Sequence, residues 1–297
     1  MSPVLDGTVL RLRGLRPEYP DAYAVRLGVP AESGWSPVAD LTPQVVEDWC
    51  AEARERDNPQ RLASVAATAV GGALTHAVLG RVTAALLLER RAWDVDAANL
   101  AVHRTDGYLD QVAVRGATGL VLPDDPAAGT PGTAVLPDTG ALLDRVASRA
   151  VATLEPLFQA VRAATRYGVV PLWNGAADAV RSAAAYVPLY AHTDQRAARE
   201  LGTALVDALV AHGARIRGRA VHEPLLWRDR SYAVPVRAAC CLYYKTEPAT
   251  ERPGDEYCMT CPFLCGDDRA RRFTSFLDAL EPVGTRLTPA PLPVAGR

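Results

Sequence analysis

The sequence predicts an α+β protein that is predominantly α-helical, with a small antiparallel sheet and a cysteine-rich segment near its C-terminus. Alanine-rich stretches with apolar residues at helical spacing occur in both halves of the 297-residue chain, which favours helices. Residues 99–114 alternate instead around Asp106-Gly107, a dipeptide typical of a two-residue hairpin turn. Five of the six cysteines lie between positions 240 and 265, which indicates a site rather than scattered structural thiols.

The N-terminal part of the chain, residues 1–122, is expected to form an α+β lobe. A helix is predicted to begin after Thr42, which suits the N-cap position, with Pro43 as the first helical residue. Cys50, the one cysteine far from the others, falls on the inner face of this helix. We interpret it as a small buried hydrophobic residue.

The most apolar part of the chain is residues 61–91. Between positions 62 and 88 the only ionisable residues are His76 and Arg81, so a membrane span has to be considered. Gly71-Gly72 and the many alanines keep the hydrophobicity modest, which favours a buried core helix, or two helices broken near these glycines. His76 is then a hydrogen-bonded core histidine. Peripheral contact with the inner face of a membrane stays open.

A segment rich in proline, glycine and aspartate, residues 123–140, is predicted to link the N-terminal lobe to a helical C-terminal lobe formed by residues 141–297. The first helix of the second lobe contains Pro156, which should kink or divide it. The helices expected in this lobe span residues 141–167, 173–186, 194–212 and 267–280. Residues 282–297 are predicted to be a disordered tail.

Charge and motif content argue against several classes of function. The net charge of −2 gives no electrostatic footprint for nucleic acid. The chain has no G-x-G-x-x-G and no Walker A sequence, so neither a dinucleotide nor ATP is indicated. It also lacks G-x-S-x-G and H-E-x-x-H, the motifs of common hydrolases and zincins. Electrons for any redox reaction would therefore come from a partner.

The clustered cysteines form two pairs. Cys240 and Cys241 are adjacent, and Cys258 and Cys261 have the C-x2-C spacing that presents two thiolates to one metal. The 16 residues between the pairs include two prolines and a glycine, so a loop can bring the pairs together. Disulfides are disfavoured because the N-terminus shows no export signal, and we expect a cytoplasmic protein with reduced thiols. Adjacent cysteines also bridge only with strain. The pattern predicts a four-thiolate metal site.

The residues leave the metal open between structural zinc and an iron–sulfur cluster. Four cysteines around tetrahedral zinc are common, but the usual second C-x2-C is replaced here by Cys240-Cys241. Successive side chains of an extended backbone point to opposite faces, so adjacent thiolates do not converge easily on one small ion. A [2Fe–2S] rhomb is larger and tolerates other placements of its four cysteines, which gives it a slight advantage.

The sequence R-x-x-C-C-L-Y-Y-K (residues 237–245), followed by Y-C-x-x-C-P (residues 257–262), resembles the C-terminal signature of FhuF-type ferric siderophore reductases. The resemblance covers about 30 residues and implies a [2Fe–2S] cluster whose ligands are Cys240, Cys241, Cys258 and Cys261. The interval between the pairs is several residues longer here than in that family. Cys265 is an additional thiol, and a [4Fe–4S] cluster on Cys258, Cys261 and Cys265 is a less favoured alternative.

The resemblance implies a cytoplasmic enzyme that reduces an Fe(III)-siderophore by one electron and releases Fe(II). Its electron donor would be a ferredoxin or a flavin reductase. Residues 171–180 also resemble a tryptophan–asparagine helix start in this family, which makes Trp173 and Asn174, with Arg237, candidates for substrate contact. The alternatives are that Trp173 packs in the core, Asn174 caps a helix and Arg237 is solvated. The rival functions are a non-enzymatic protein with structural zinc and an iron–sulfur electron carrier or sensor.

Overall fold

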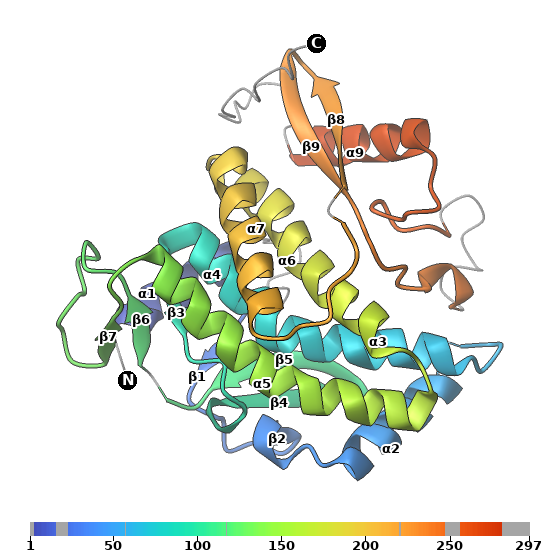
Figure 1. The fold of residues 1–297 in the computed structure, drawn as a ribbon, viewed down its shortest axis with the longest axis horizontal. Coiled ribbons are helices and arrows are strands. Elements are labelled where there is room, and N and C mark those ends of the chain that lie inside the picture. The colour runs from blue at the N-terminus through green and yellow to red at the C-terminus, as the bar shows by residue number, and fades with distance from the viewer. Residues whose placement is uncertain are drawn as a thin grey trace.

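The protein is a predominantly helical α+β structure, which confirms the predicted class (Figure 1). The computed structural model describes residues 3–15, 23–56, 58–116, 118–219, 221–246 and 256–280. The predicted disordered tail and most of the loop between the two cysteine pairs lie outside these residues. Where the sequence suggested one small antiparallel sheet, the described residues form three small sheets, two of which also contain a parallel strand pair.

The first helices of the chain are α1 (Pro3–Gly14) and α2 (Pro43–Glu55). The start of α2 is as predicted, because the Thr42 hydroxyl oxygen accepts a hydrogen bond from the Val45 N–H at 3.3 Å and Pro43 follows the cap. Cys50 is 3% exposed and belongs to the main core. The start of α2 is therefore fixed by its cap, and its apolar inner face is buried.

The apolar segment 63–89 is helical throughout. It consists of α3 (Ala63–Thr75), a π-helical turn (His76–Gly80) and α4 (Arg81–Glu89). The alternative of a break at Gly71-Gly72 is wrong, because both glycines lie inside α3. By length and composition this segment could cross a membrane, but 78% of its most apolar 18-residue window is buried inside the protein. The burial agrees with the core helix predicted from the sequence.

The largest sheet has the strand order β1-β5-β4-β2. It joins β1 (Arg26–Leu27), β2 (Trp35–Pro37), β4 (Leu100–Thr105) and β5 (Tyr108–Val114). The predicted hairpin is β4–β5, and its turn residues Asp106 and Gly107 have φ values of 50° and 81°. Both values are positive, as a type I′ turn requires. The second sheet contains β3 (Ala92–Trp93), β6 (Gly119–Val121) and β7 (Thr133–Val135).

The second half of the chain supplies three long helices and a hairpin. The helices α5 (Thr139–Thr165), α6 (Val169–Ala191) and α7 (Gln195–Ala211) follow one another and pack together. Pro156 lies inside α5 and does not divide it. After α7 the chain forms an antiparallel hairpin that was not predicted from the sequence, β8 (Val221–Trp227) with β9 (Arg230–Val236). The last element among the described residues is α9 (Gly266–Leu280).

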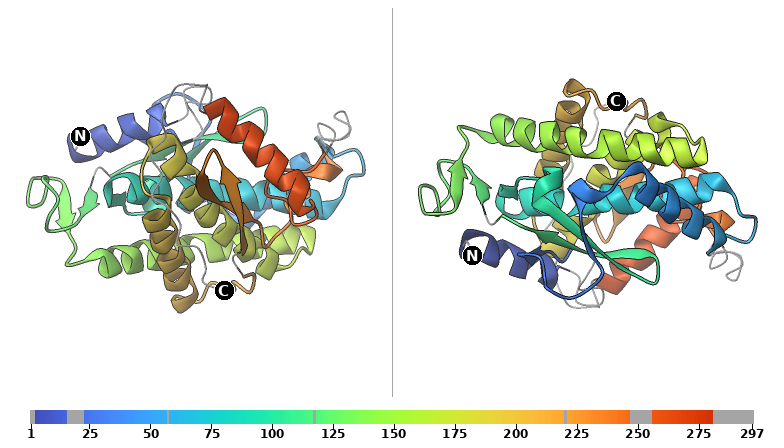
Figure 2. Two further views of the ribbon diagram at one scale, coloured as in Figure 1. Left: turned by 90° about the horizontal axis from the view of Figure 1, so that it is seen from above. Right: turned by 90° about the horizontal axis from the view of Figure 1, so that it is seen from below.

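The hydrophobic core does not follow the predicted division into lobes 1–122 and 141–297. One buried cluster extends from Leu5 to Ala214, because α5 and α6 pack against α2, α3 and α4. The expected linker 123–140 contains β7, which pairs with β6. A second, smaller core joins the β8–β9 hairpin to α9 and the end of α6, and consists of Leu189, Trp227, Tyr232, Val234, Phe273 and Leu277. Figures 1 and 2 show this hairpin and α9 grouped together at one end of the molecule.

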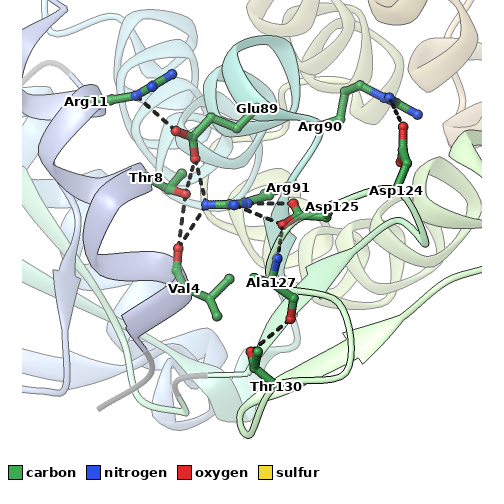
Figure 3. Close-up of polar contacts among 10 residues, drawn as sticks. All are labelled: Val4, Thr8, Arg11, Glu89, Arg90, Arg91, Asp124, Asp125, Ala127 and Thr130. Carbon is green, nitrogen blue, oxygen red and sulfur yellow. Dashed lines mark hydrogen bonds and ion pairs between the residues drawn. The ribbon is translucent and has the colours of Figure 1, made fainter.

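A network of ion pairs joins α1, the end of α4 and the segment after β6 (Figure 3). The Arg91 guanidinium donates to both carboxylate oxygens of Asp125 at 2.6 and 2.9 Å, and also to the Val4 carbonyl at 3.2 Å. Glu89 accepts from Arg91 at 3.3 Å and from the Thr8 hydroxyl. The Arg91 side chain lowers the pKa of Asp125. The start of the predicted linker is thus fastened to the helical core.

Candidate metal centre

The first cysteine pair is positioned by α6. After β9 the chain crosses α6, where the Asp178 carboxylate accepts hydrogen bonds from the N–H groups of Ala238 at 3.0 Å and Ala239 at 2.8 Å. Asp178 is 2% exposed, and burial raises its pKa despite these donors and the nearby arginines. The closest guanidinium nitrogens are those of Arg181 at 3.5 Å and Arg237 at 3.9 Å. A buried carboxylate therefore holds the two residues that precede Cys240.

A second anchor comes from α3. The Thr68 hydroxyl donates to the Cys241 carbonyl oxygen at 3.1 Å. The next residue, Leu242, adopts a left-handed conformation with φ of 57°, and its N–H donates to the Cys240 sulfur at 3.4 Å. A short 3₁₀ turn, Tyr243–Lys245, follows. The adjacent cysteines thus lie across α3 and α6, with a backbone reversal immediately after them.

The second cysteine pair is held by the segment that carries the first pair and by α9. The Arg237 N–H donates to the Thr260 carbonyl at 3.0 Å, which joins the two cysteine segments directly. The C-x2-C turn closes through a bond from the Cys261 N–H to the Cys258 carbonyl at 2.9 Å. Arg269 of α9, 2% exposed, donates to the carbonyls of Cys261 at 2.8 Å and Leu264 at 2.6 Å. A buried arginine therefore fixes this turn.

The two pairs meet through Cys241 and Cys258, whose sulfur atoms are 3.8 Å apart. Two thiolates bound to one tetrahedral ion, each about 2.3 Å from it, are separated by about 3.8 Å. The hydrogen bond between the sulfurs lowers the pKa of Cys241 to about 5, with a further contribution from Arg237. The same bond raises the pKa of Cys258, so the two groups share one proton.

The other predicted ligands lie close to this contact. Cys240 is half-buried, and burial together with the charges of Cys241 and Cys261 raises its pKa. Cys261 is 2% exposed. Cys265 is exposed at the start of α9, where its thiol hydrogen-bonds Asp268 and lowers the pKa of that carboxyl. The additional thiol therefore has a partner outside the predicted ligand set.

The donor set fits a thiolate-bound metal by its chemistry and by the Cys241–Cys258 distance. The four cysteine sulfurs are not arranged as a complete four-coordinate site. In the part of the chain that the structure describes, no three His, Cys, Asp or Glu side chains are arranged so that they could hold a metal ion. The structure thus brings the two cysteine pairs together and leaves the choice of metal to the donor chemistry.

A cavity of about 280 Å³ opens beside Cys240 and Cys241, between α3, the π turn and α6. Its wall includes Arg237 and Asp178 from the site described above. His76 also lines it, half-buried in the π turn and 6.2 Å from the Tyr23 ring, measured between ring centroids. A position in the core was predicted for His76. Gly80, four residues later, leaves room for the imidazole, because a Cβ there would lie 2.2 Å from its Nδ1.

Of the three predicted substrate contacts, only Arg237 lines this cavity, and its Nε is buried with no hydrogen-bond partner. Trp173 is fully buried, donates from its indole N–H to Glu155 at 2.8 Å, and packs edge-on against Phe158. The Asn174 side-chain oxygen accepts from the N–H groups of Arg217 and Gly218, both at 2.9 Å. These are the contacts of structural residues.

Sequence reasoning missed the anchors Thr68, Asp178 and Arg269. One signal was present for Asp178. Asn174, Asp178 and Arg181 are spaced as i, i+4 and i+7 on α6, so they form a polar row along a helix that is otherwise mainly apolar. Asp178 binds the backbone just before Cys240, whereas Asn174 and Arg181 bind the backbone at Gly218, before β8. Thr68 and Arg269 had no comparable signal, because their partners are distant in sequence.

Comparison with known proteins adds no family assignment. No protein-family model matches the sequence, and no curated protein matches it. The resemblance to FhuF-type reductases therefore rests on the cysteine signature of the sequence alone.

Proposed function

We propose that this protein reduces ferric siderophores by one electron in the cytoplasm, using a [2Fe–2S] cluster held by Cys240, Cys241, Cys258 and Cys261. The observation that carries the proposal is the meeting of the two cysteine pairs, with the Cys241 and Cys258 sulfurs 3.8 Å apart although 17 positions separate them. The C-C and C-x2-C arrangement is the signature shared with FhuF-type reductases. A cluster of this kind supplies one-electron redox chemistry.

The reaction requires little covalent work from the protein. Siderophores hold iron through hard oxygen donors, which favour Fe(III) strongly over the softer Fe(II). When the chelate gains one electron, its iron becomes Fe(II), and the chelating oxygens can then take up protons as the ion leaves. The electron comes from a ferredoxin or a flavin reductase. A difference of about 59 mV between donor and chelate changes a one-electron equilibrium tenfold.

The residues of the chain hold the four thiolates and set the charge around them. Asp178 and Thr68 fasten the backbone of the first pair, while Arg269 fastens the turn of the second. The Arg237 guanidinium stabilises negative charge on Cys241 and Cys258. The N–H of Leu242 donates to the Cys240 sulfur at 3.4 Å. Hydrogen bonds to ligand sulfurs and nearby positive charge both raise the reduction potential of an iron–sulfur centre.

A protein with structural zinc is the second candidate, because the 3.8 Å separation of the two sulfurs suits a tetrahedral zinc ion equally well. One experiment separates the two. Protein purified without oxygen is analysed for metals, and its visible absorption and low-temperature EPR spectra are recorded before and after dithionite.

About two irons per chain, with an S = 1/2 signal after reduction, support the cluster. Reduction of ferric chelates faster than a free ferredoxin achieves then distinguishes a reductase from a carrier or sensor. A colourless protein with one tightly bound zinc contradicts the proposal.

A further inference from the structure

The two cysteine pairs border two different hollows of the protein surface. Cys240 and Cys241 form part of the wall of the cavity between α3, the π turn and α6. Cys258 instead lines a groove on the side of α9, together with Met259 and Ser275. Neither Cys240 nor Cys241 lines that groove. A metal centre held by both pairs would therefore have one neighbouring hollow that is enclosed by the helical core and another that lies along α9.

The cavity on the Cys240 side is built with unusual local structure. The π turn His76–Gly80 interrupts an otherwise α-helical segment and places the imidazole of His76 in the cavity wall. Single π turns inside α-helices are rare and occur frequently at functional sites. Tyr23 lines the cavity beside His76. Two ring systems that can form hydrogen bonds therefore lie in its wall.

Two helical glycines, Gly72 of α3 and Gly175 of α6, keep the cavity open. A Cβ built at either position meets no atom within 4 Å, so neither glycine is required for helix packing. By contrast, Gly71 permits close packing, because its Cβ would lie 2.5 Å from Leu172. Glycine inside a helix costs about 0.5–1 kcal/mol relative to alanine. The open space beside Gly72 and Gly175 is thus a feature that packing does not explain.

The size and polarity of the cavity indicate what it can hold. Its volume of about 280 Å³ is near the lower limit of small-molecule sites, so it would take one part of a siderophore and leave the remainder outside. Three residues with hydroxyl side chains, Thr68, Thr75 and Ser182, line it. Its charged residues, Arg237 and Asp178, lie 3.9 Å apart and offset each other. The lining suits a polar, uncharged arm of a chelate.

We propose that this cavity is the docking site of the ferric chelate, which inserts one polar arm between α3 and α6 and brings its iron next to Cys240 and Cys241. The inference rests on the proposed function and adds to it the side of the centre from which the substrate approaches. His76 and Tyr23 contact the inserted arm.

The test fills each hollow in turn with a leucine. Gly175→Leu fills the cavity from α6, and Gly72→Leu fills it from α3; a Cβ at either position meets no atom within 4 Å. Ser275→Leu is the matched control, because it fills the groove beside Cys258 from an exposed position on α9. Iron content, visible absorption and the EPR signal of each variant verify that the metal centre is intact before binding is measured.

Binding is measured by calorimetry with redox-inert gallium(III) complexes of a trihydroxamate, a tris-catecholate and a hydroxycarboxylate. Reduction of the matching ferric complexes is followed by stopped flow, with hexacyanoferrate(III) as a small acceptor that needs no cavity. Gly175→Leu and Gly72→Leu should each weaken binding of the chelate that the wild type prefers at least tenfold and slow its reduction. They should leave hexacyanoferrate(III) reduction unchanged, and Ser275→Leu should behave as the wild type.

The outcomes separate this inference from the proposed function. A wild type without a cluster, or with one that reduces no ferric chelate, contradicts both. If the wild type reduces chelates and both glycine variants bind and reduce them normally, the function stands and the cavity is not the docking site. The docking proposal also fails if Ser275→Leu alone weakens binding, or if a wild type that reduces ferric chelates binds none of the gallium complexes.

Discussion

Replacement of Asp178 by alanine should release the cysteine segment from α6. The carboxylate accepts two backbone N–H groups, from Ala238 at 3.0 Å and Ala239 at 2.8 Å. Ala239 is buried, so loss of its acceptor leaves an unsatisfied donor, which costs about 1–3 kcal/mol. Ala238 is partly exposed and can be hydrated, so its bond adds a contribution near the lower end of that range. We expect Asp178→Ala to lower the free energy of unfolding by about 2–4 kcal/mol.

Asp178→Asn should cost less than the alanine variant. The amide oxygen can still accept one of the two N–H groups, and the substitution also removes a charge whose burial is unfavourable. That burial raises the pKa of Asp178 above its unfolded value, so the folded state binds the proton more readily. The contribution of this carboxyl to the free energy of unfolding therefore increases as the pH falls through its folded pKa. Asp178→Asn should lose this dependence on pH.

Asn174→Ala is the matched control for the role of Asp178 at the metal centre. Asn174 lies one turn away on α6 and also accepts two backbone N–H groups, but from Arg217 and Gly218, which lie before β8. Urea unfolding followed by circular dichroism gives the stabilities, and the rate of iron loss to an added chelator gives retention of the centre. Both alanine variants should be less stable, and only Asp178→Ala should lose iron faster. Equal iron retention in the two variants would refute the positioning role of Asp178.

Three further predictions concern residues around the centre and in the core. Serine replacement of Cys240, Cys241, Cys258 or Cys261 should abolish the visible spectrum of the purified protein. Cys265→Ser should retain the spectrum, since that thiol bonds Asp268. An unchanged spectrum in any of the first four variants would contradict the ligand set. Gly218→Ala places a Cβ 2.3 Å from that of Ala238 and should destabilise the protein by about 1–3 kcal/mol. The Cβ of Gly175→Ala meets no atom within 4 Å, so this variant should be more stable than the wild type. The midpoints of urea unfolding test both expectations. Asp125→Asn should be less stable than the wild type at pH 7, and this difference in unfolding free energy should shrink as the pH falls below about 4. The reason is that Arg91 lowers the pKa of Asp125, so the stability that the carboxylate contributes is lost when it takes up a proton. A difference that stays constant from about pH 7 to about pH 3 would exclude the Arg91–Asp125 pair as its source.

Local signals in the sequence were sufficient for several elements of the fold. Thr42 and Pro43 predicted the start of α2, and Asp106-Gly107 predicted the β4–β5 turn, because each signal acts within a few residues. The packing of α5 and α6 onto α2, α3 and α4 was not predictable in this way. A proline- and glycine-rich segment indicates a loop, but it does not say whether the elements on either side share a core. This is why the sequence did not indicate that both predicted lobes contribute to the main core, which extends from Leu5 to Ala214.

The β8–β9 hairpin was missed for a related reason. Its strands contain Pro224 and Pro235, and proline is unusual inside strands because it cannot donate a ladder hydrogen bond. Its turn is Arg228-Asp229 rather than a glycine-containing pair. Both turn residues nevertheless have positive φ, at 46° and 63°. Burial of Trp227 and Tyr232 against Phe273 of α9 supplies the stability that the local sequence does not. The hairpin thus depends on contacts with a helix more than 30 positions later.

The candidate site was visible in the sequence only where its chemistry is carried by rare residues. The cysteine pairs could be recognised by their type and spacing, whereas Trp173 and Asn174 were selected because they resemble a family pattern. In the structure those two residues bind Glu155 and the backbone of residues 217–218. Common residues such as Thr68 and Asp178 acquire their roles from the tertiary fold, which brings distant backbone groups to them. Their positions could therefore not be derived from spacing alone.

The adjacency of Cys240 and Cys241 raised the question of how neighbouring thiols can serve one centre. The backbone reverses at Leu242, whose left-handed conformation allows its N–H to bond the Cys240 sulfur, while the Cys241 sulfur contacts Cys258. The two adjacent thiols are thereby given different partners. A single zinc ion needs both of them at one point, but a binuclear rhomb can take one on each iron. The structure thus shows how adjacent thiols can face different partners, which is what the proposed iron–sulfur cluster requires of them.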